Sequence, residues 1–123
     1  MRELENRLLI LLSNIRLSEK ETDEIISILK TQSIDWRYVI DMSCAQGING
    51  TIYYHTKLLK DYFPRRIILQ YKYFNKEIIS IESGQYDEYK KIYSDFIKNN
   101  IQPVILKGFS FSKYFYRLPG IRV

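Results

Sequence analysis

Cysteine and histidine are almost missing from this 123-residue chain, which has one residue of each type. The single Cys44 excludes an internal disulfide framework and fits a reducing compartment. No base stands near Cys44 to activate it, so we predict a small, inert, buried side chain. His55 has no cysteine nearby, and a metal site needs several ligands. We therefore predict a surface or half-buried histidine.

Long apolar runs are also missing. No stretch approaches the roughly 20 apolar residues that span a bilayer. Acidic side chains stand in the first five residues, where a signal peptide carries only positive charge. These absences predict a soluble, cytoplasmic protein with no membrane partner.

Acidic residues are missing from the end of the chain, because no Asp or Glu follows Asp95. Residues 1–95 hold 14 acidic and 14 basic side chains, so the whole net charge of +5 lies in residues 96–123. A segment with charge of one sign indicates an anionic ligand or an acidic partner. A solvated basic tail is the alternative.

What is present is mostly helical spacing. Apolar side chains three or four residues apart predict four shorter helices, at about 2–15, 18–30, 35–46 and 51–60. Ser18 and Glu21 form a capping-box sequence, and Asp35 is a suitable cap for the third helix. Gly47 is a plausible helix stop. We expect Asn49-Gly50 to interrupt the pattern, and we expect Trp36 to be a core anchor.

A long helix is predicted from Pro64, a residue that suits a first helical turn, to about Asn99-Asn100. One stripe runs along it for about eight turns. Gln85 is its only polar member, and Gly84 beside it is a possible bend. The stripe consists of Ile67, Tyr71, Phe74, Ile78, Ile81, Gln85, Tyr89, Ile92 and Phe96.

The chain closes with a different pattern. Residues 103–106 form a short apolar run that begins with Pro103, which predicts a buried strand. A Lys107-Gly108 turn, a short helix and a basic loop follow. A lone buried strand would leave backbone groups unpaired, and no other segment resembles a strand. We therefore expect the chain to be the N-terminal part of a longer protein.

This closing segment carries a resemblance. Leu106-Lys107-Gly108, Phe111, Tyr116 and the run from Pro119 to Arg122 are spaced as in an uncharacterised nucleotidyltransferase family of the polymerase-beta-like superfamily. Ile34-Asp35-Trp36 and Gly47-Ile48 are similar to the upstream part of the family pattern. The resemblance covers roughly residues 33–123.

The resemblance implies a fold and a function. It implies that a strand and glycine turn bind a nucleoside triphosphate, and that a second strand supplies an Asp-x-Asp pair for two metal ions. Lys107 and Gly108 fall on the family's Lys-Gly turn, and Arg122 falls on the Arg before the acidic strand. That strand is absent here, so Mg²⁺ and nucleoside triphosphate are cofactors expected of the full-length protein, with no metal ligand in this chain.

Physical chemistry gives the motif a reason. Gly108 lets the backbone approach a phosphate, and a following helix offers free N–H groups to the anion. Lys107 would add a positive charge and Ser110 a hydroxyl donor. Arg122 could bind phosphate through two parallel hydrogen bonds. The aromatic side chains between Phe109 and Phe115 are expected to be core residues.

These observations predict a mainly α-helical module at 1–100 with one long helix. At 101–123 they predict the first strand, turn and helix of a truncated α/β nucleotidyltransferase domain. One functional hypothesis is a nucleotidyltransferase-like fragment, inactive alone, whose acceptor is an unknown small molecule, protein or RNA. The alternative is a non-catalytic helical binding module whose basic tail docks on nucleic acid, peptide or an acidic partner. Acceptor, nucleotide preference, pathway and oligomeric state stay open, and so does enzymatic activity of this chain.

Overall fold

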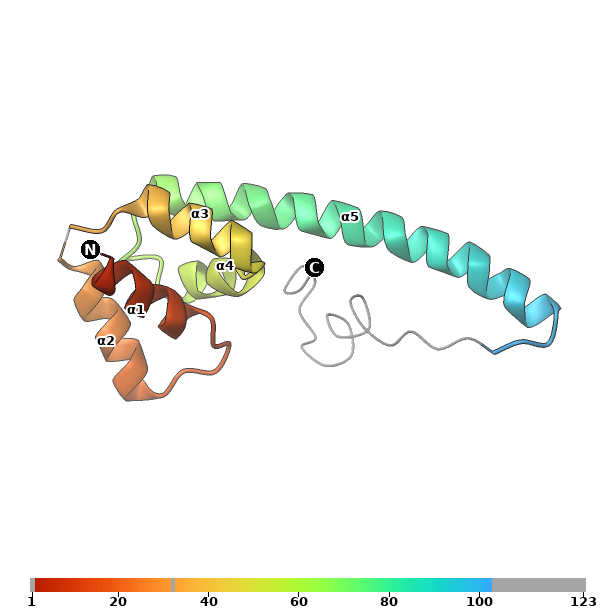
Figure 1. Ribbon diagram of the computed structural model, residues 1–123, viewed down its shortest axis with the longest axis horizontal. Helices are drawn as coiled ribbons and strands as arrows, with labels where there is room; N and C mark the ends of the chain where they lie inside the picture. The colour runs from red at the N-terminus through yellow and green to blue at the C-terminus, as the bar shows by residue number, and fades with distance from the viewer. Residues whose placement is uncertain (1, 32, 103–123) are drawn as a thin grey trace.

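The computed structural model describes residues 2–31 and 33–102, and this part of the chain is mainly helical. Four shorter helices gather around the first turns of one long helix, which extends well past them (Figure 1). The helices are α1 (Glu3–Leu12), α2 (Glu19–Leu29), α3 (Trp36–Gln46), α4 (Asn49–Leu58) and α5 (Arg65–Lys98).

All five helices contribute to one apolar core. Leu8, Ile25, Val39 and Ile52 are fully buried, each from a different short helix, and Tyr71 of α5 is buried against them. The helical spacing predicted for α1 and α2 is confirmed, because each helix buries an apolar face in this core. Trp36 is confirmed as a core anchor, because its ring centroid lies 5.9 Å from that of Phe63. The full core cluster consists of Leu8, Leu9, Leu11, Leu12, Ile25, Ile28, Leu29, Trp36, Val39, Ile52, Phe63, Ile67 and Tyr71.

The start of α2 is fixed by the predicted capping box. The Ser18 hydroxyl accepts from the Glu21 backbone N–H at 3.1 Å, and the Glu21 carboxylate accepts from the Ser18 N–H at 3.1 Å. Arg7 of α1 donates two hydrogen bonds to Glu24 of α2, at 2.8 and 2.9 Å. Local capping therefore sets where α2 begins, and a bidentate ion pair holds α1 and α2 together.

The start of α3 is tied back to α1. Asp35 caps α3 as predicted, because its carboxylate accepts from the Tyr38 backbone N–H at 3.1 Å. Arg2 forms an ion pair with Asp35, and the buried Glu5 carboxylate accepts from the Asp35 N–H at 2.9 Å. These bonds hold the pKa of Asp35 below its usual value, the Tyr38 N–H being the main cause and Arg2 the next.

The α3–α4 junction confirms one prediction and corrects another. Gly47 adopts a left-handed conformation, with φ of 67°, and ends α3 in a Schellman motif. Asn49-Gly50 was expected to interrupt the helical pattern, but both residues form the first turn of α4. Since Gly47 already redirects the chain, Asn49 is free to begin a new helix. The α4 boundaries accordingly lie two residues earlier than expected.

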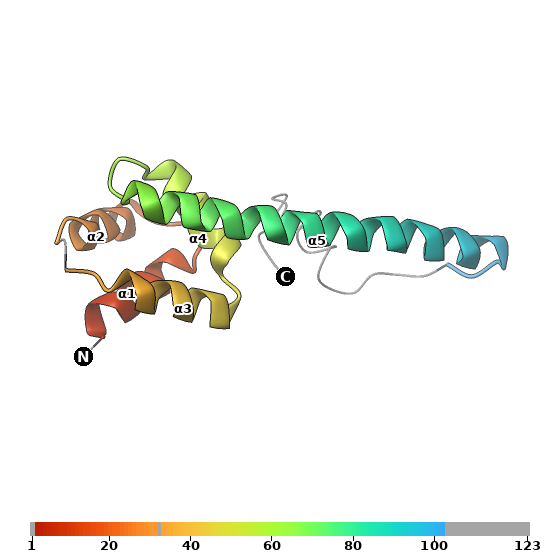
Figure 2. The same cartoon turned by 90° about the horizontal axis from the view of Figure 1, so that it is seen from above.

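Helix α5 is continuous through Gly84, so the possible bend there does not interrupt it. It leaves the bundle and runs on alone among the described elements, as the view from above also shows (Figure 2). Asn100 has φ of 60°, and the Ile101 N–H donates to the Phe96 carbonyl at 2.9 Å. This is again a Schellman ending, and it confirms the predicted stop at Asn99-Asn100.

The predicted strand at 103–106 lies outside the described residues. Within residues 2–31 and 33–102, none of the helices combines the length and apolar character that a membrane span requires.

Candidate functional site

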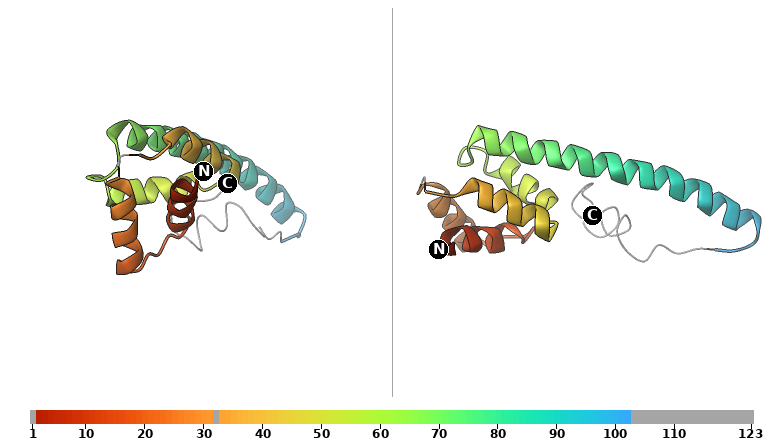
Figure 3. Two further views of the ribbon diagram at one scale, coloured as in Figure 1. Left: turned by 60° about the vertical axis from the view of Figure 1, so that its left-hand side comes forward. Right: turned by 45° about the horizontal axis from the view of Figure 1, so that its top comes forward.

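The four predicted phosphate-binding residues, Lys107, Gly108, Ser110 and Arg122, all lie outside the described residues. The structure therefore describes what precedes this segment: α5, its Schellman ending, and the turn at residues 99–102. In both views of Figure 3, the turn at residues 99–102 is located at the end of α5 that is distant from the short helices. The predicted phosphate-binding segment begins five residues after Gln102.

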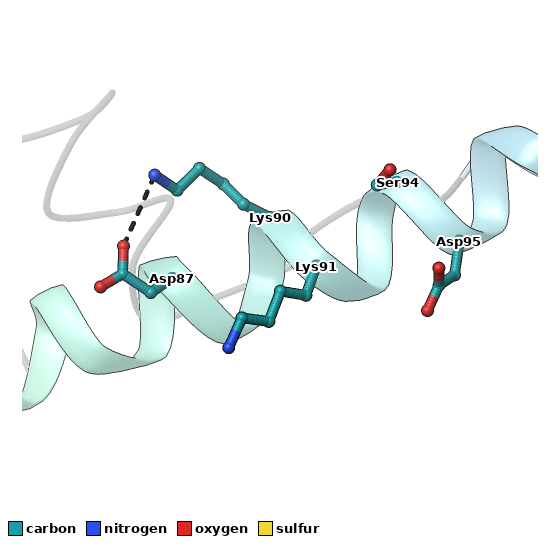
Figure 4. Close-up of a pocket in the computed structure, with 5 residues that line it drawn as sticks. All are labelled: Asp87, Lys90, Lys91, Ser94 and Asp95. Carbon is teal, nitrogen blue, oxygen red and sulfur yellow. Dashed lines mark ion pairs between the residues drawn. The ribbon is translucent and has the colours of Figure 1, made fainter.

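The polar face of α5 near that end carries charges of both signs. Lys90 forms an ion pair with Asp87, with 3.5 Å between Nζ and Oδ1, and both side chains are well exposed. Lys90 and Ser94 project to one side of the helix, while Lys91 and Asp95 project to the other (Figure 4). Exposed pairs of this kind contribute little energy, and side chains that diverge do not converge on a ligand. These five side chains therefore do not form a ligand site.

A partly enclosed hollow of about 390 Å³ lies where the α1–α2 connection meets α2 and α4. Its walls are mainly apolar, with one guanidinium and one imidazole among them. The lining residues are Ile15, Arg16, Leu17, Thr22, Tyr54, His55, Leu58 and Leu59.

His55 in this hollow corrects a sequence prediction, because its side chain is only 1% exposed. Its Nε2 lies 2.5 Å from the Asn14 carbonyl oxygen. A carbonyl can only accept, so Nε2 carries the proton and donates. Burial lowers the pKa of His55 below its usual value, and the bond to Asn14 only partly opposes this. His55 thus ties α4 to the end of α1 as a neutral ring.

The spacing of residues in the sequence could have predicted the burial of His55, although the amino-acid composition could not. His55 stands three residues after Ile52, at the spacing of one helix face. The buried face of α4 is otherwise built of small residues, namely Gly50, Thr51 and Thr56. His55 therefore lies on the buried face of α4 together with Ile52.

A second buried polar contact joins α3 to α5. The Ser43 hydroxyl donates to the Ile40 carbonyl at 2.9 Å, which uses its only proton. The Tyr71 hydroxyl, 2.8 Å away, must then donate to Ser43. Burial raises the pKa of Tyr71 to about 12, so this phenol stays protonated. The pair fixes the start of α5 against the bundle and has no nucleophilic character.

Cys44 also differs from its prediction, since it is exposed. The inner face of α3 passes through Trp36, Val39 and Ser43, and the residue after Ser43 turns away from the core. The Asn49 side-chain amide donates to the Cys44 sulfur at 3.4 Å. Cys44 is therefore a surface thiol beside the α3–α4 junction.

No group of three or more His, Cys, Asp or Glu side chains in the described part of the chain could hold a metal ion.

No curated protein and no solved structure matches this chain. A family model described as uncharacterised nucleotidyltransferase matches residues 32–123, from just before α3 through the whole Lys107–Arg122 segment. Helices α1 and α2 precede the match, although they share its core. Since the match covers well over half of the sequence, the chain belongs to this uncharacterised nucleotidyltransferase family.

Proposed function

We propose that residues 107–122 bind the phosphates of a nucleoside triphosphate, and that the helical module of α1–α5 supports this segment. Lys107 and Arg122 supply positive charge, Gly108 allows close approach of the backbone, and Ser110 offers a hydroxyl donor. In the complete reaction, the bond between the α- and β-phosphates breaks, the nucleotidyl group passes to an acceptor (a small molecule, a protein or an RNA), and pyrophosphate leaves.

The family match over residues 32–123 is the observation that carries this proposal. The distribution of charge supports it independently, because residues 96–123 hold five basic and no acidic side chains. A phosphate-binding segment benefits from such an excess, since charge of one sign attracts anions.

The closing segment, residues 96–123, does not by itself fit a magnesium site. Mg²⁺ prefers carboxylate oxygens, and none is present in residues 96–123. Phosphoryl-type transfer depends on metal ions that neutralise developing charge. We therefore propose that nucleotide binding by residues 107–122 does not require Mg²⁺.

Titration of the full chain with ATP tests the proposal. Lys107→Ala should weaken binding roughly tenfold or more, because it removes a charge-assisted hydrogen bond to phosphate. Lys113→Ala is the matched control, since it removes the same charge from the same segment outside the Lys-Gly turn. We expect the control to bind almost as tightly as the wild type.

Two outcomes would contradict the assignment. Equal affinity of the wild type and Lys107→Ala would remove Lys107 from the site. Equal losses in Lys107→Ala and Lys113→Ala would indicate a diffuse basic surface. That second result would favour a non-catalytic module that docks on an acidic partner or nucleic acid, with nucleic-acid binding that weakens steeply as salt rises.

A further inference from the structure

The apolar stripe of α5 is only partly covered by the rest of the described chain. Its first members, Ile67 and Tyr71, are 1% and 0% exposed, and Phe74 is the last α5 side chain packed against the core. Farther along, Ile81 and Ile92 are each 54% exposed. We call the outer part of this stripe the distal stripe; it comprises Ile78, Ile81, Gln85, Tyr89, Ile92 and Phe96.

Helix length explains why coverage stops. The 34 residues of α5 make a rod of about 51 Å, whereas the ten residues of α4 span about 15 Å. The short helices therefore cover only the beginning of α5. An exposed row of large apolar side chains, continuous with a buried one, marks a surface that packs against something.

An acidic edge borders the distal stripe. Glu77, Glu88 and Asp95 are exposed and follow one another at intervals of eleven and seven residues. At 3.6 residues per turn these intervals place all three on one line along the helix. Glu77 also accepts a hydrogen bond from Tyr73, which raises the pKa of that phenol. A partner for this surface should combine apolar side chains with positive charge.

Residues 103–123 of the chain itself have that composition. Eleven of the 21 residues are aliphatic or aromatic, four are Lys or Arg, and none is acidic. Fully extended, 21 residues reach about 70 Å. The distance from Phe96 back to Ile78 along α5 is about 27 Å, so the segment is long enough to follow the whole distal stripe.

The end of α5 sends the chain in the required direction. The Schellman motif at Asn100 ends the helix, and residues 99–102 turn back toward the bundle in two perpendicular views (Figures 1 and 2). In Figure 1 the turn descends on the side of α5 where α4 lies. That is the side on which the covered part of the stripe meets the short helices.

We propose that residues 103–123 fold back along α5 and pack on the distal stripe, with Lys113 and Arg117 beside the acidic edge and Lys107 and Arg122 left for phosphate. The long helix then holds the predicted phosphate-binding segment close to the helical module. This inference does not depend on nucleotide binding, and it can be tested without nucleotide.

Hydrogen exchange of the full chain tests the docking. In the wild type, amides in residues 104–118 should exchange slowly, at a rate independent of protein concentration. Ile81→Lys and Ile92→Lys should each speed their exchange about tenfold or more, because each removes a buried isoleucine contact and adds a repelling charge. Lysine is a good helix former, so circular dichroism should report an intact α5.

Ile79→Lys is the matched control. Ile79 is 39% exposed and lies about 160° around the helix axis from Ile81, off the stripe. It should leave exchange in residues 104–118 unchanged. Identical exchange in the wild type and all three variants would overturn the proposal. So would protection that appears only at high protein concentration with a doubled mass, because the occupant would then be a second copy of the chain.

Discussion

At the scale of single residues, two polar contacts inside this small core fix the protonation of His55 and Tyr71. His55 is held neutral by burial and donates through Nε2 to the Asn14 carbonyl. Tyr71 donates to Ser43 and keeps its proton. Sequence reasoning identified neither pair, since each joins residues far apart in the chain, and a lone histidine or serine gives no local sign of its partner.

His55 makes the free energy of unfolding depend on pH in the range below about pH 6.5. Its pKa is lowered from 6.5 in the folded state, so the unfolded chain binds the extra proton first. Stability should be complete above pH ~6.5 and should fall as the pH drops below it, by at most about 1.4 kcal/mol per pH unit. Urea unfolding of the wild type and His55→Gln between about pH 7.5 and 5 measures this slope.

The three carboxylates with lowered pKa values do not contribute to this pH dependence between about pH 7.5 and 5. The pKa values of Glu21, Glu24 and Asp35 lie below their usual values, so their contributions are present above pH ~4.5 and are lost only at lower pH. The chain has no second histidine. His55→Gln should therefore flatten the slope, and an unchanged slope would show that another group is responsible.

At the scale of elements, the sequence predicted most where the signal is local. The capping box at Ser18, the cap at Asp35 and the stop at Gly47 each depend on residues within one helical turn, and all three are confirmed. The start of α4 was wrong because Asn-Gly is typical of a turn, and only the Schellman motif just before it removes the need for one. The apolar stripe predicted helix α5 correctly. Its periodicity could not show how much of the stripe the short helices would cover.

Gly84 in the middle of α5 offers a test of how backbone entropy contributes to the stability of this long helix. Gly84 is helical, and an added Cβ there would meet nothing within 4 Å. Gly84→Ala should stabilise the helix locally by about 0.5–1 kcal/mol, through reduced backbone entropy in the unfolded chain. Amides near residue 84 should then exchange roughly two to five times more slowly. Faster exchange would show that this position needs glycine for a close contact.

At the scale of the whole molecule, the chain combines an electrically neutral helical module with a basic segment. Residues 1–95 are neutral overall, and residues 96–123 carry the entire net charge. The family match spans both parts, from residue 32 to residue 123, while α1 and α2 complete the core from outside it. The fold of the module could be predicted from the sequence, and the four candidate site residues, which lie outside the described part, remain predictions.

The central claim is that residues 107–122 bind nucleotide phosphates. Residue-resolved NMR of the full chain during an ATP titration, with and without Mg²⁺, tests it most directly. Phosphate at a glycine turn and helix start engages backbone N–H groups, so the largest shifts should fall on the amides of residues 107–112 and on Arg122, whether or not Mg²⁺ is present. Shifts confined to α1–α4, or no shifts at saturating ATP, would contradict the account.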